Sequence, residues 1–321
     1  MIAIIIATIA GVCATTQASV NAETRRLIKS PYLSAAFNFV FSIIVLLPLI
    51  LLIDHNLHIP FAEISRYPLW IWLGGCCGPF VIMTSVHSVP AIGSARHMML
   101  ACTAQILGGL IIDQFGLLGS QQIPMTLARF IGAALVLGGI VAVSIEKGGT
   151  SDEESIEKSM KARRGLPIAV FFILSLINGT AAAVQVAANG TLNTVVDNAL
   201  KTALISMCIG LTVTCLIMAV LSIVRSPDAI FEEGTKFNIV KPNRFMAYGG
   251  TLAVVVVGGN TVAANVLGTG LVNILNLAGM MAMSLFVDAI GLLGIAKKPV
   301  TILKLVGMGM IIAGAAIISL M

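Results

Sequence analysis

Long apolar stretches alternate with short polar segments along the whole chain. Each stretch holds about 20 residues, the length that an α-helix needs to cross the hydrocarbon core of a bilayer. The pattern predicts ten membrane-spanning helices, at about residues 2–21, 33–53, 69–88, 94–112, 127–145, 167–188, 202–224, 245–264, 269–290 and 300–320. The most polar stretch, residues 146–165, divides the first five helices from the last five.

The two halves repeat one another in sequence. Gly11, Gln17 and Asn21 recur 168 positions later as Gly179, Gln185 and Asn189. The segment 113–119 recurs 175 positions later as 288–294. A chain that crosses the membrane five times starts its second copy from the opposite side. We therefore expect an all-α integral membrane protein of ten transmembrane helices, built as two inverted five-helix repeats (1–145 and 166–321) joined by the hydrophilic linker 146–165.

Composition narrows the classes of protein further. Of the 321 residues, 58% are apolar and only 10% are charged, whereas a soluble domain carries about 25% charged residues. A soluble globular enzyme is therefore excluded. The apolar stretch at the N-terminus has no basic segment before it, so we expect it to remain as a spanning helix of a multi-pass protein of the cytoplasmic (inner) membrane.

Basic residues predict the orientation. Of the 19 Lys and Arg residues, 16 lie after odd-numbered helices and only Arg66, Arg129 and Lys201 lie after even-numbered ones. Because basic residues gather in cytoplasmic loops, both termini are predicted to be extracytoplasmic. This distribution accounts for the net charge of +5 without a nucleic-acid partner.

Sequence motifs give no sign of bound cofactors. The six cysteines lie inside apolar stretches without C-x-x-C spacing, so neither a metal site nor a cofactor is expected. No Walker A sequence is present, which excludes direct use of ATP. An intramembrane enzyme is disfavoured because no predicted helix holds two acidic residues or an H-E-x-x-H motif.

Amide side chains are the first candidates for contact with a solute. Gln17 and Asn21 share one face of the first predicted helix, and Gln185 and Asn189 share the equivalent face of the sixth. Amides both donate and accept hydrogen bonds, so they suit a neutral or zwitterionic ligand. The alternative is that they bond helix to helix as packing contacts.

A second set of candidates lies on the fourth and ninth predicted helices. His97 and Gln105 lie on the fourth helix, and Asn273 and Asn276 lie on the ninth. His97 is a candidate for ion coupling, because its ordinary pKa of about 6.5 is close to physiological pH. Val272 occupies the equivalent position, so His97 breaks the repeat.

A pair of acidic residues occupies equivalent positions in the two halves. Asp113 and Asp288 each precede a Gly-Leu-Leu-Gly segment. They are candidates for a coupling ion. Their matched positions equally favour a structural role in bonding loop amides.

Several of these residues form a recognisable pattern. The pattern is Gly11-x5-Gln17-x3-Asn21, then Ser30-Pro31-x3-Ala35, Pro90-x2-Gly93, Gln105 and Asp113-x-Phe-Gly-Leu-Leu-Gly119. It resembles the YdcZ-like family of the drug/metabolite transporter superfamily. The resemblance implies five-helix units that assemble antiparallel, here in a fused form, and a role in moving metabolites or drugs. The second half departs from the pattern at Asn198-Ala199, Asn265 and Met280.

Together these features predict a secondary transporter that moves a small polar solute by alternating access. The first, third, fourth, sixth, eighth and ninth helices are expected to line the route. The expected partners are the solute and the lipid bilayer, with the fused chain acting as a monomeric pseudo-dimer. A channel and a non-transporting receptor remain alternatives. Relatives in the superfamily imply both termini inside, opposite to the distribution of basic residues.

Overall fold

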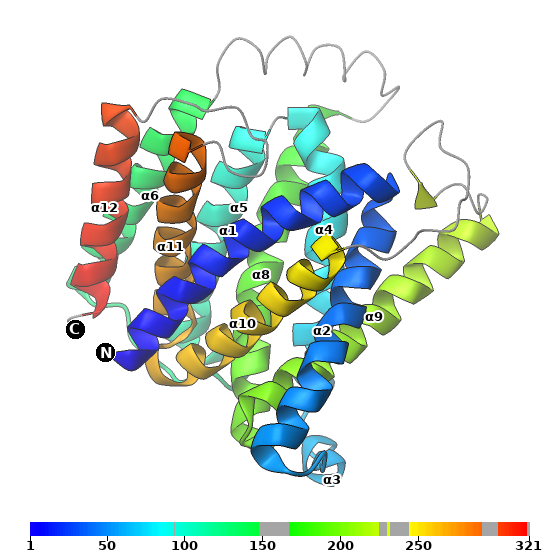
Figure 1. The fold of residues 1–321 in the computed structure, drawn as a ribbon. Helices are drawn as coiled ribbons and strands as arrows, with labels where there is room; N and C mark the ends of the chain where they lie inside the picture. Colours follow the sequence, from blue (N-terminus) through cyan, green and yellow to red (C-terminus); the bar gives the residue numbers. More distant parts are fainter. Residues whose placement is uncertain (93, 148–166, 225–229, 232–243, 291–300, 320–321) are drawn as a thin grey trace.

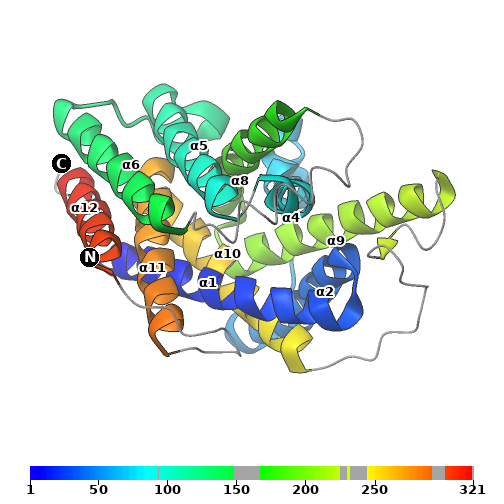
Figure 2. The same cartoon turned by 90° about the horizontal axis from the view of Figure 1, so that it is seen from above.

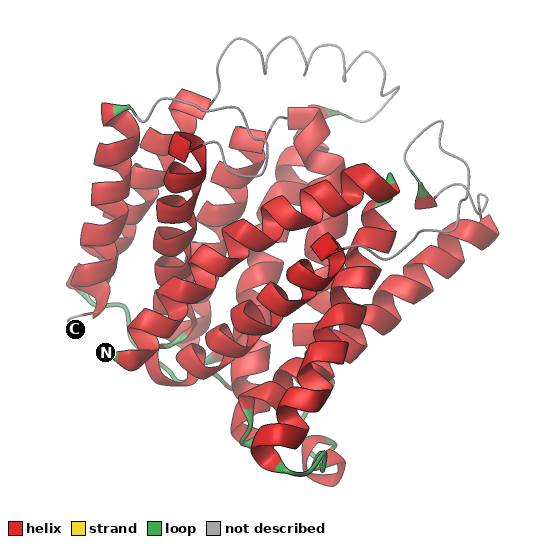
Figure 3. Cartoon of the chain, in the orientation of Figure 1, coloured by secondary structure: helices red, strands yellow, loops and turns green. Residues whose placement is uncertain are grey.

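The chain folds into a bundle of long helices (Figure 1). The computed structural model describes residues 1–92, 94–147, 167–224, 230–231, 244–290 and 301–319, and within these ranges it contains helices and loops but no strand (Figure 3). The long helices are α1 (Ile2–Ile28), α2 (Pro31–Asp54), α4 (Leu73–Ile92), α5 (Ser94–Phe115), α6 (Leu127–Lys147), α8 (Ile168–Val196), α9 (Ala199–Val224), α10 (Arg244–Leu267), α11 (Thr269–Ile290) and α12 (Ile302–Ser319). Each corresponds to one predicted span, so the ten-helix prediction is confirmed.

Short helical turns join some of these long helices. They are α3 (Phe61–Ile64), η1 (Leu69–Trp72) and η2 (Leu117–Gly119). Eight of the long helices are long and apolar enough to cross a membrane, and the apolar helices Leu69–Ser85 and Leu127–Val143 are shorter. The third predicted span is therefore a 3-10 turn, η1, followed by the α-helix α4.

Helices of one half pack between helices of the other (Figures 1 and 2). Helix α1 packs on α10 and α11, while its counterpart α8 packs on α4 and α5. Helix α2 packs on α9, and α6 packs on α12. The contacts of α1 with α10 and α11 are therefore equivalent to those of α8 with α4 and α5, and the pairs α2–α9 and α6–α12 each join equivalent helices of the two halves. This is the packing of two related five-helix repeats.

The contact between α6 and α12 shows that the repeats are inverted. A side chain at Gly132 would meet the carbonyl of Gly314, and one at Gly139 would meet the carbonyl of Gly307. Positions that advance along α6 thus meet positions that go back along α12, so the helices are antiparallel. Since they are the fifth helices of their repeats, the repeats run in opposite directions.

The same local signal starts the second helix of each repeat. Ser30 precedes α2, and its hydroxyl accepts a hydrogen bond from the amide of Leu33 (3.1 Å). Asn198 precedes α9, and its side-chain oxygen accepts from the amide of Lys201 (3.0 Å). Both are N-cap interactions, which satisfy a backbone donor that the helix leaves unpaired. The replacement of Ser30 by Asn198 in the second half therefore preserves the cap.

Candidate functional site

A cavity of about 340 Å³ lies between the two repeats. Its wall includes residues of α1, α2, α4 and α5 from the first repeat and α8, α9, α10 and α11 from the second. Helices α2 and α9 were not expected to line the route, and they add Asn38 and Ser206 to the wall. None of the 24 lining residues is Asp, Glu, Lys, Arg or His.

The cavity lies on the axis that relates the two repeats. Twenty of the 24 lining residues form ten pairs at the offsets of the sequence repeat, 168 for α1 and α2 and 175 for α4 and α5. The polar pairs at the shorter offset are Gln17 with Gln185, Asn21 with Asn189 and Asn38 with Ser206. Such a position is where transporters built from inverted repeats bind their solutes.

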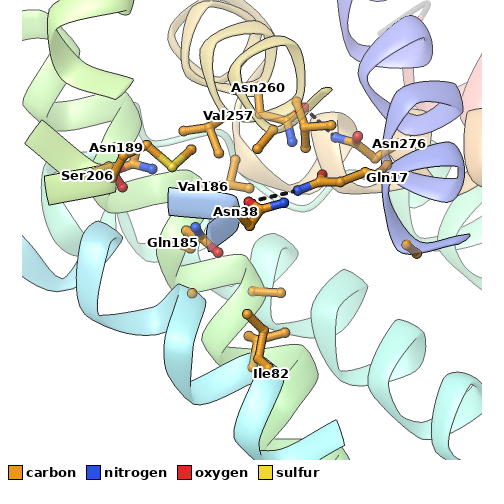
Figure 4. Close-up of a pocket in the computed structure, with 18 of the residues that line it drawn as sticks. Gln17, Asn38, Ile82, Gln185, Val186, Asn189, Ser206, Val257, Asn260 and Asn276 are labelled. Atoms are coloured by element: carbon orange, nitrogen blue, oxygen red, sulfur yellow. Dashed lines mark hydrogen bonds between the residues drawn. The ribbon is translucent and has the colours of Figure 1, made fainter. Parts of the chain in front are cut away.

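The amides of the first repeat are bonded to one another. Gln17 donates through Nε2 to Oδ1 of Asn38 (3.4 Å; Figure 4). Asn38 donates through Nδ2 to Oδ1 of Asn21 (3.0 Å). A second bonded pair lies between α11 and α10, where Asn276 donates to Oδ1 of Asn260 (2.7 Å). These bonds hold the amide groups in fixed positions.

The equivalent amides of the second repeat are not bonded in this way. Asn189 is buried, with 3% of its surface exposed, and its Oδ1 has no hydrogen-bond partner. Gln185 and Ser206 also line the cavity, and neither side chain forms a hydrogen bond to another residue in the part of the chain that the structure describes. The difference arises because the hydroxyl of Ser206 replaces the amide of Asn38, which bridges Gln17 and Asn21.

Six of the eight predicted solute-binding residues line the cavity: Gln17, Asn21, Gln105, Gln185, Asn189 and Asn276. The other two, His97 and Asn273, are not among the lining residues. Asn273 lies behind Gln105, whose Nε2 donates to Oδ1 of Asn273 (3.2 Å), and Asn273 donates back to the backbone carbonyl of Gln105 (3.2 Å). Asn273 therefore positions a lining residue.

His97 lies in a buried polar cluster between α5, α4 and α8. Its Nδ1 is 2.8 Å from the hydroxyl of Ser175, and its Nε2 is 3.2 Å from the hydroxyl of Ser85. Asn178 donates to the same hydroxyl of Ser85 (2.9 Å) and to that of Thr84 (2.8 Å). The cluster joins α8 to α4 and α5, and Val272 stands at the equivalent position of the other repeat.

Asp113 forms structural contacts outside the cavity wall. It is fully buried, and its carboxylate accepts hydrogen bonds from the backbone amides of Thr269 and Gly270 (both 2.8 Å) at the start of α11. Arg129, also buried, donates to the same carboxylate (3.1 Å). The geometry favours the structural alternative for Asp113. Asp288 lies in α11, but its side chain is outside the described residues.

Sequence reasoning missed Asn38, Ser206 and Asn260. The first two lie on helices whose apolar character suggests contact with lipid alone. The repeat could have found them, because the offset of 168 pairs one polar residue, Asn38, with another, Ser206. Asn260 has Ser85 at the equivalent position, so a search for paired polar residues would have identified it as well.

Ten helices in inverted repeats around an uncharged cavity define a membrane transport protein. A family model described as "Putative inner membrane exporter, YdcZ" matches residues 2–142 and 170–317. The chain therefore belongs to this YdcZ family of the drug/metabolite transporter superfamily, in a fused two-domain form. It is a multi-pass inner membrane protein of a transporter family, not of an enzyme family.

The fold is shared with solved structures. Twenty-six chains of solved structures match. One, described only as the crystal structure of a protein, is similar over 99% of this chain and 97% of its own length, with a TM-score of 0.68 and 16% sequence identity. At this identity the likeness shows the fold alone. No curated protein matches the chain.

Proposed function

We propose that the chain exports a small polar solute across the inner membrane by alternating access of the two repeats. The observation that supports this most directly is the position of the cavity on the axis between the repeats, with hydrogen-bonding groups from both. In this proposal residues 1–145 and 166–321 are the moving repeats, and a single fused chain is the working unit. The family of exporters is the reason for favouring export over import.

Solute counterflow in proteoliposomes tests the proposal. Purified full-length protein would be reconstituted, loaded with an unlabelled solute and exposed to a labelled trace of the same solute. A carrier gives transient, saturable accumulation of the label. The excess unlabelled solute inside occupies most of the sites that return to the outside, so label that has entered leaves only slowly. A channel, the alternative function, would only let the label equilibrate. Absence of counterflow across a panel of neutral, anionic and cationic solutes would contradict the carrier mechanism.

The orientation remains a prediction from the distribution of basic residues. With both termini outside, the linker 146–165 is cytoplasmic and the loop after α2 is extracytoplasmic. In a background without native cysteines, Ser65→Cys should react with a membrane-impermeant thiol reagent in intact cells, whereas Ser155→Cys should react only after lysis. The reverse pattern would place both termini inside.

His97 remains the candidate for ion coupling, through its buried cluster instead of direct contact with the solute. Val272 shows that an apolar residue is compatible with the equivalent position, so His97→Val is expected to fold. We expect it to bind solute but to lose transport driven by a proton gradient, measured in the same proteoliposomes. Unchanged gradient-driven transport would remove His97 from the mechanism.

A further inference from the structure

We propose that the cavity selects uncharged solutes with a carboxamide-like group, in which a hydrogen-bond donor lies beside an acceptor. The group would be held at the Gln185 and Ser206 side of the cavity, and the apolar body of the solute would face the remaining wall. The proposal rests on the proposed function, since it concerns the solute that this cavity carries.

The two sides of the cavity differ in their free hydrogen-bonding capacity. On the first repeat, Gln17, Asn38 and Asn21 form a bonded chain. On the second repeat, the side chains of Gln185 and Ser206 line the cavity and form no hydrogen bond to another described residue. Oδ1 of Asn189 is also unpaired, but it is buried against Gly74 and does not face the cavity. Groups that already share hydrogen bonds offer less to a ligand than groups that form none. A solute should therefore bind at the second repeat.

The chemistry of Gln185 defines the group that fits. Its side-chain amide has two N–H donors and one carbonyl acceptor. A ligand group that satisfies both kinds of group must itself present an acceptor and a donor close together, as a carboxamide, a urea or a lactam does. The hydroxyl of Ser206 adds a group that both donates and accepts.

The absence of charge in the wall excludes ionic solutes. None of the 24 residues lining the cavity is charged, so an ion or a zwitterion would lose its hydration without gaining an opposite charge. That cost is far greater than for a neutral amide. Apolar side chains, including Val186 and Val257 (Figure 4), also line the cavity. They favour a solute with an apolar body, and a volume of about 340 Å³ suits a small ligand.

Matched probes can test the charge preference. Benzamide, benzoate and benzylammonium share one ring and differ in the charge of the attached group. Their affinities for the purified full-length protein would be measured by the shift in melting temperature as a function of probe concentration. We expect benzamide and nicotinamide to bind and the two charged probes to bind at least tenfold more weakly. Charged probes binding as tightly as benzamide, or no binding of either neutral amide, would overturn the proposal.

Matched variants can test the side of the cavity. Loss of one hydrogen bond is worth about 0.5–1.5 kcal/mol, so Gln185→Leu and Ser206→Ala should each weaken benzamide binding about 2- to 13-fold. Gln17→Leu, at the position equivalent to Gln185, should weaken binding less than Gln185→Leu does. Thr212→Val, on the exposed face of the same helix as Ser206 and outside the cavity wall, is the control and should leave the affinity unchanged. Ser206→Ala removes a single oxygen and keeps the test valid if Gln185→Leu fails to fold. An equal loss for Gln17→Leu, or no loss for Ser206→Ala and Gln185→Leu, would overturn the assignment.

Counterflow separates this proposal from the proposed function. Counterflow of a charged solute without binding of benzamide would support transport and contradict the solute class. Binding of benzamide with the expected effects of the variants, but without counterflow of any solute, would support the solute class and contradict transport.

Discussion

Asp113→Ala is expected to reduce the free energy of unfolding by about 3–5 kcal/mol, the usual cost of removing one partner of a buried ion pair. The guanidinium of Arg129 would remain buried without its carboxylate, at 5% exposure. The backbone amides of Thr269 and Gly270, at the start of α11, would lose their acceptor as well. Thermal unfolding of the purified protein in detergent would show the loss as a lower melting temperature.

Asp113→Asn is the matched control. The asparagine keeps one oxygen that can accept from an amide of α11 and loses the charge, so it should be less destabilising than alanine. The pair also decides between the two roles of this residue. A stable Asp113→Asn variant that fails in gradient-driven transport would support ion coupling, whereas an alanine variant as stable as the parent would contradict the structural role.

The ten helices could be predicted from the sequence because each crossing of the lipid core requires about 20 mostly apolar residues. Such stretches can be recognised in the sequence without knowledge of the packing. Their ends were less predictable. Helix α1 continues to Ile28 and α8 to Val196, about seven residues beyond the predicted spans. These extensions contain polar residues, which lower hydropathy without ending a helix. The two end points are 168 positions apart, so the extension follows the repeat, but the predicted ends followed it as well and the repeat alone could not reveal the extra turns.

The cavity was only partly predictable. Spacing placed Gln17 with Asn21 and Gln185 with Asn189 on common helix faces, and all four line the cavity. Spacing cannot say which face of a helix meets which neighbour, so His97 was grouped with solute contacts although it packs against Ser175. The unequal bonding of the two repeats also required the structure, because it depends on distances between side chains of different helices.

Close helix crossings at Gly11 and Gly179 position the two glutamines, Gln17 and Gln185. A methyl group at Gly11 would overlap the backbone carbonyl of Asn276 on α11, and one at Gly179 would overlap that of Ala101 on α5. The two contacts are equivalent under the repeat, at offsets of 168 and 175. Small residues allow this approach of helix backbones in membranes. Gln17 and Gln185 lie six residues further along the same helices, so both crossings set the position of cavity groups.

Gly11→Ala and Gly179→Ala are therefore each expected to destabilise the protein by about 3 kcal/mol, the upper end of the usual cost of overpacking, because the obstacle is backbone and cannot rotate away. Gly309→Ala is the control: no described atom outside the adjoining backbone of its own helix and its two chain neighbours lies within 4 Å of the added methyl group. Alanine is also favoured over glycine in a helix by about 0.5–1 kcal/mol. Melting temperatures of the three variants in detergent measure the difference. Equal melting temperatures for the three variants would contradict a role of these two crossings in stabilising the contact between the repeats. A loss at only one crossing would mean that the other can relax, and the two repeats would then differ in rigidity as they differ in bonding at the cavity.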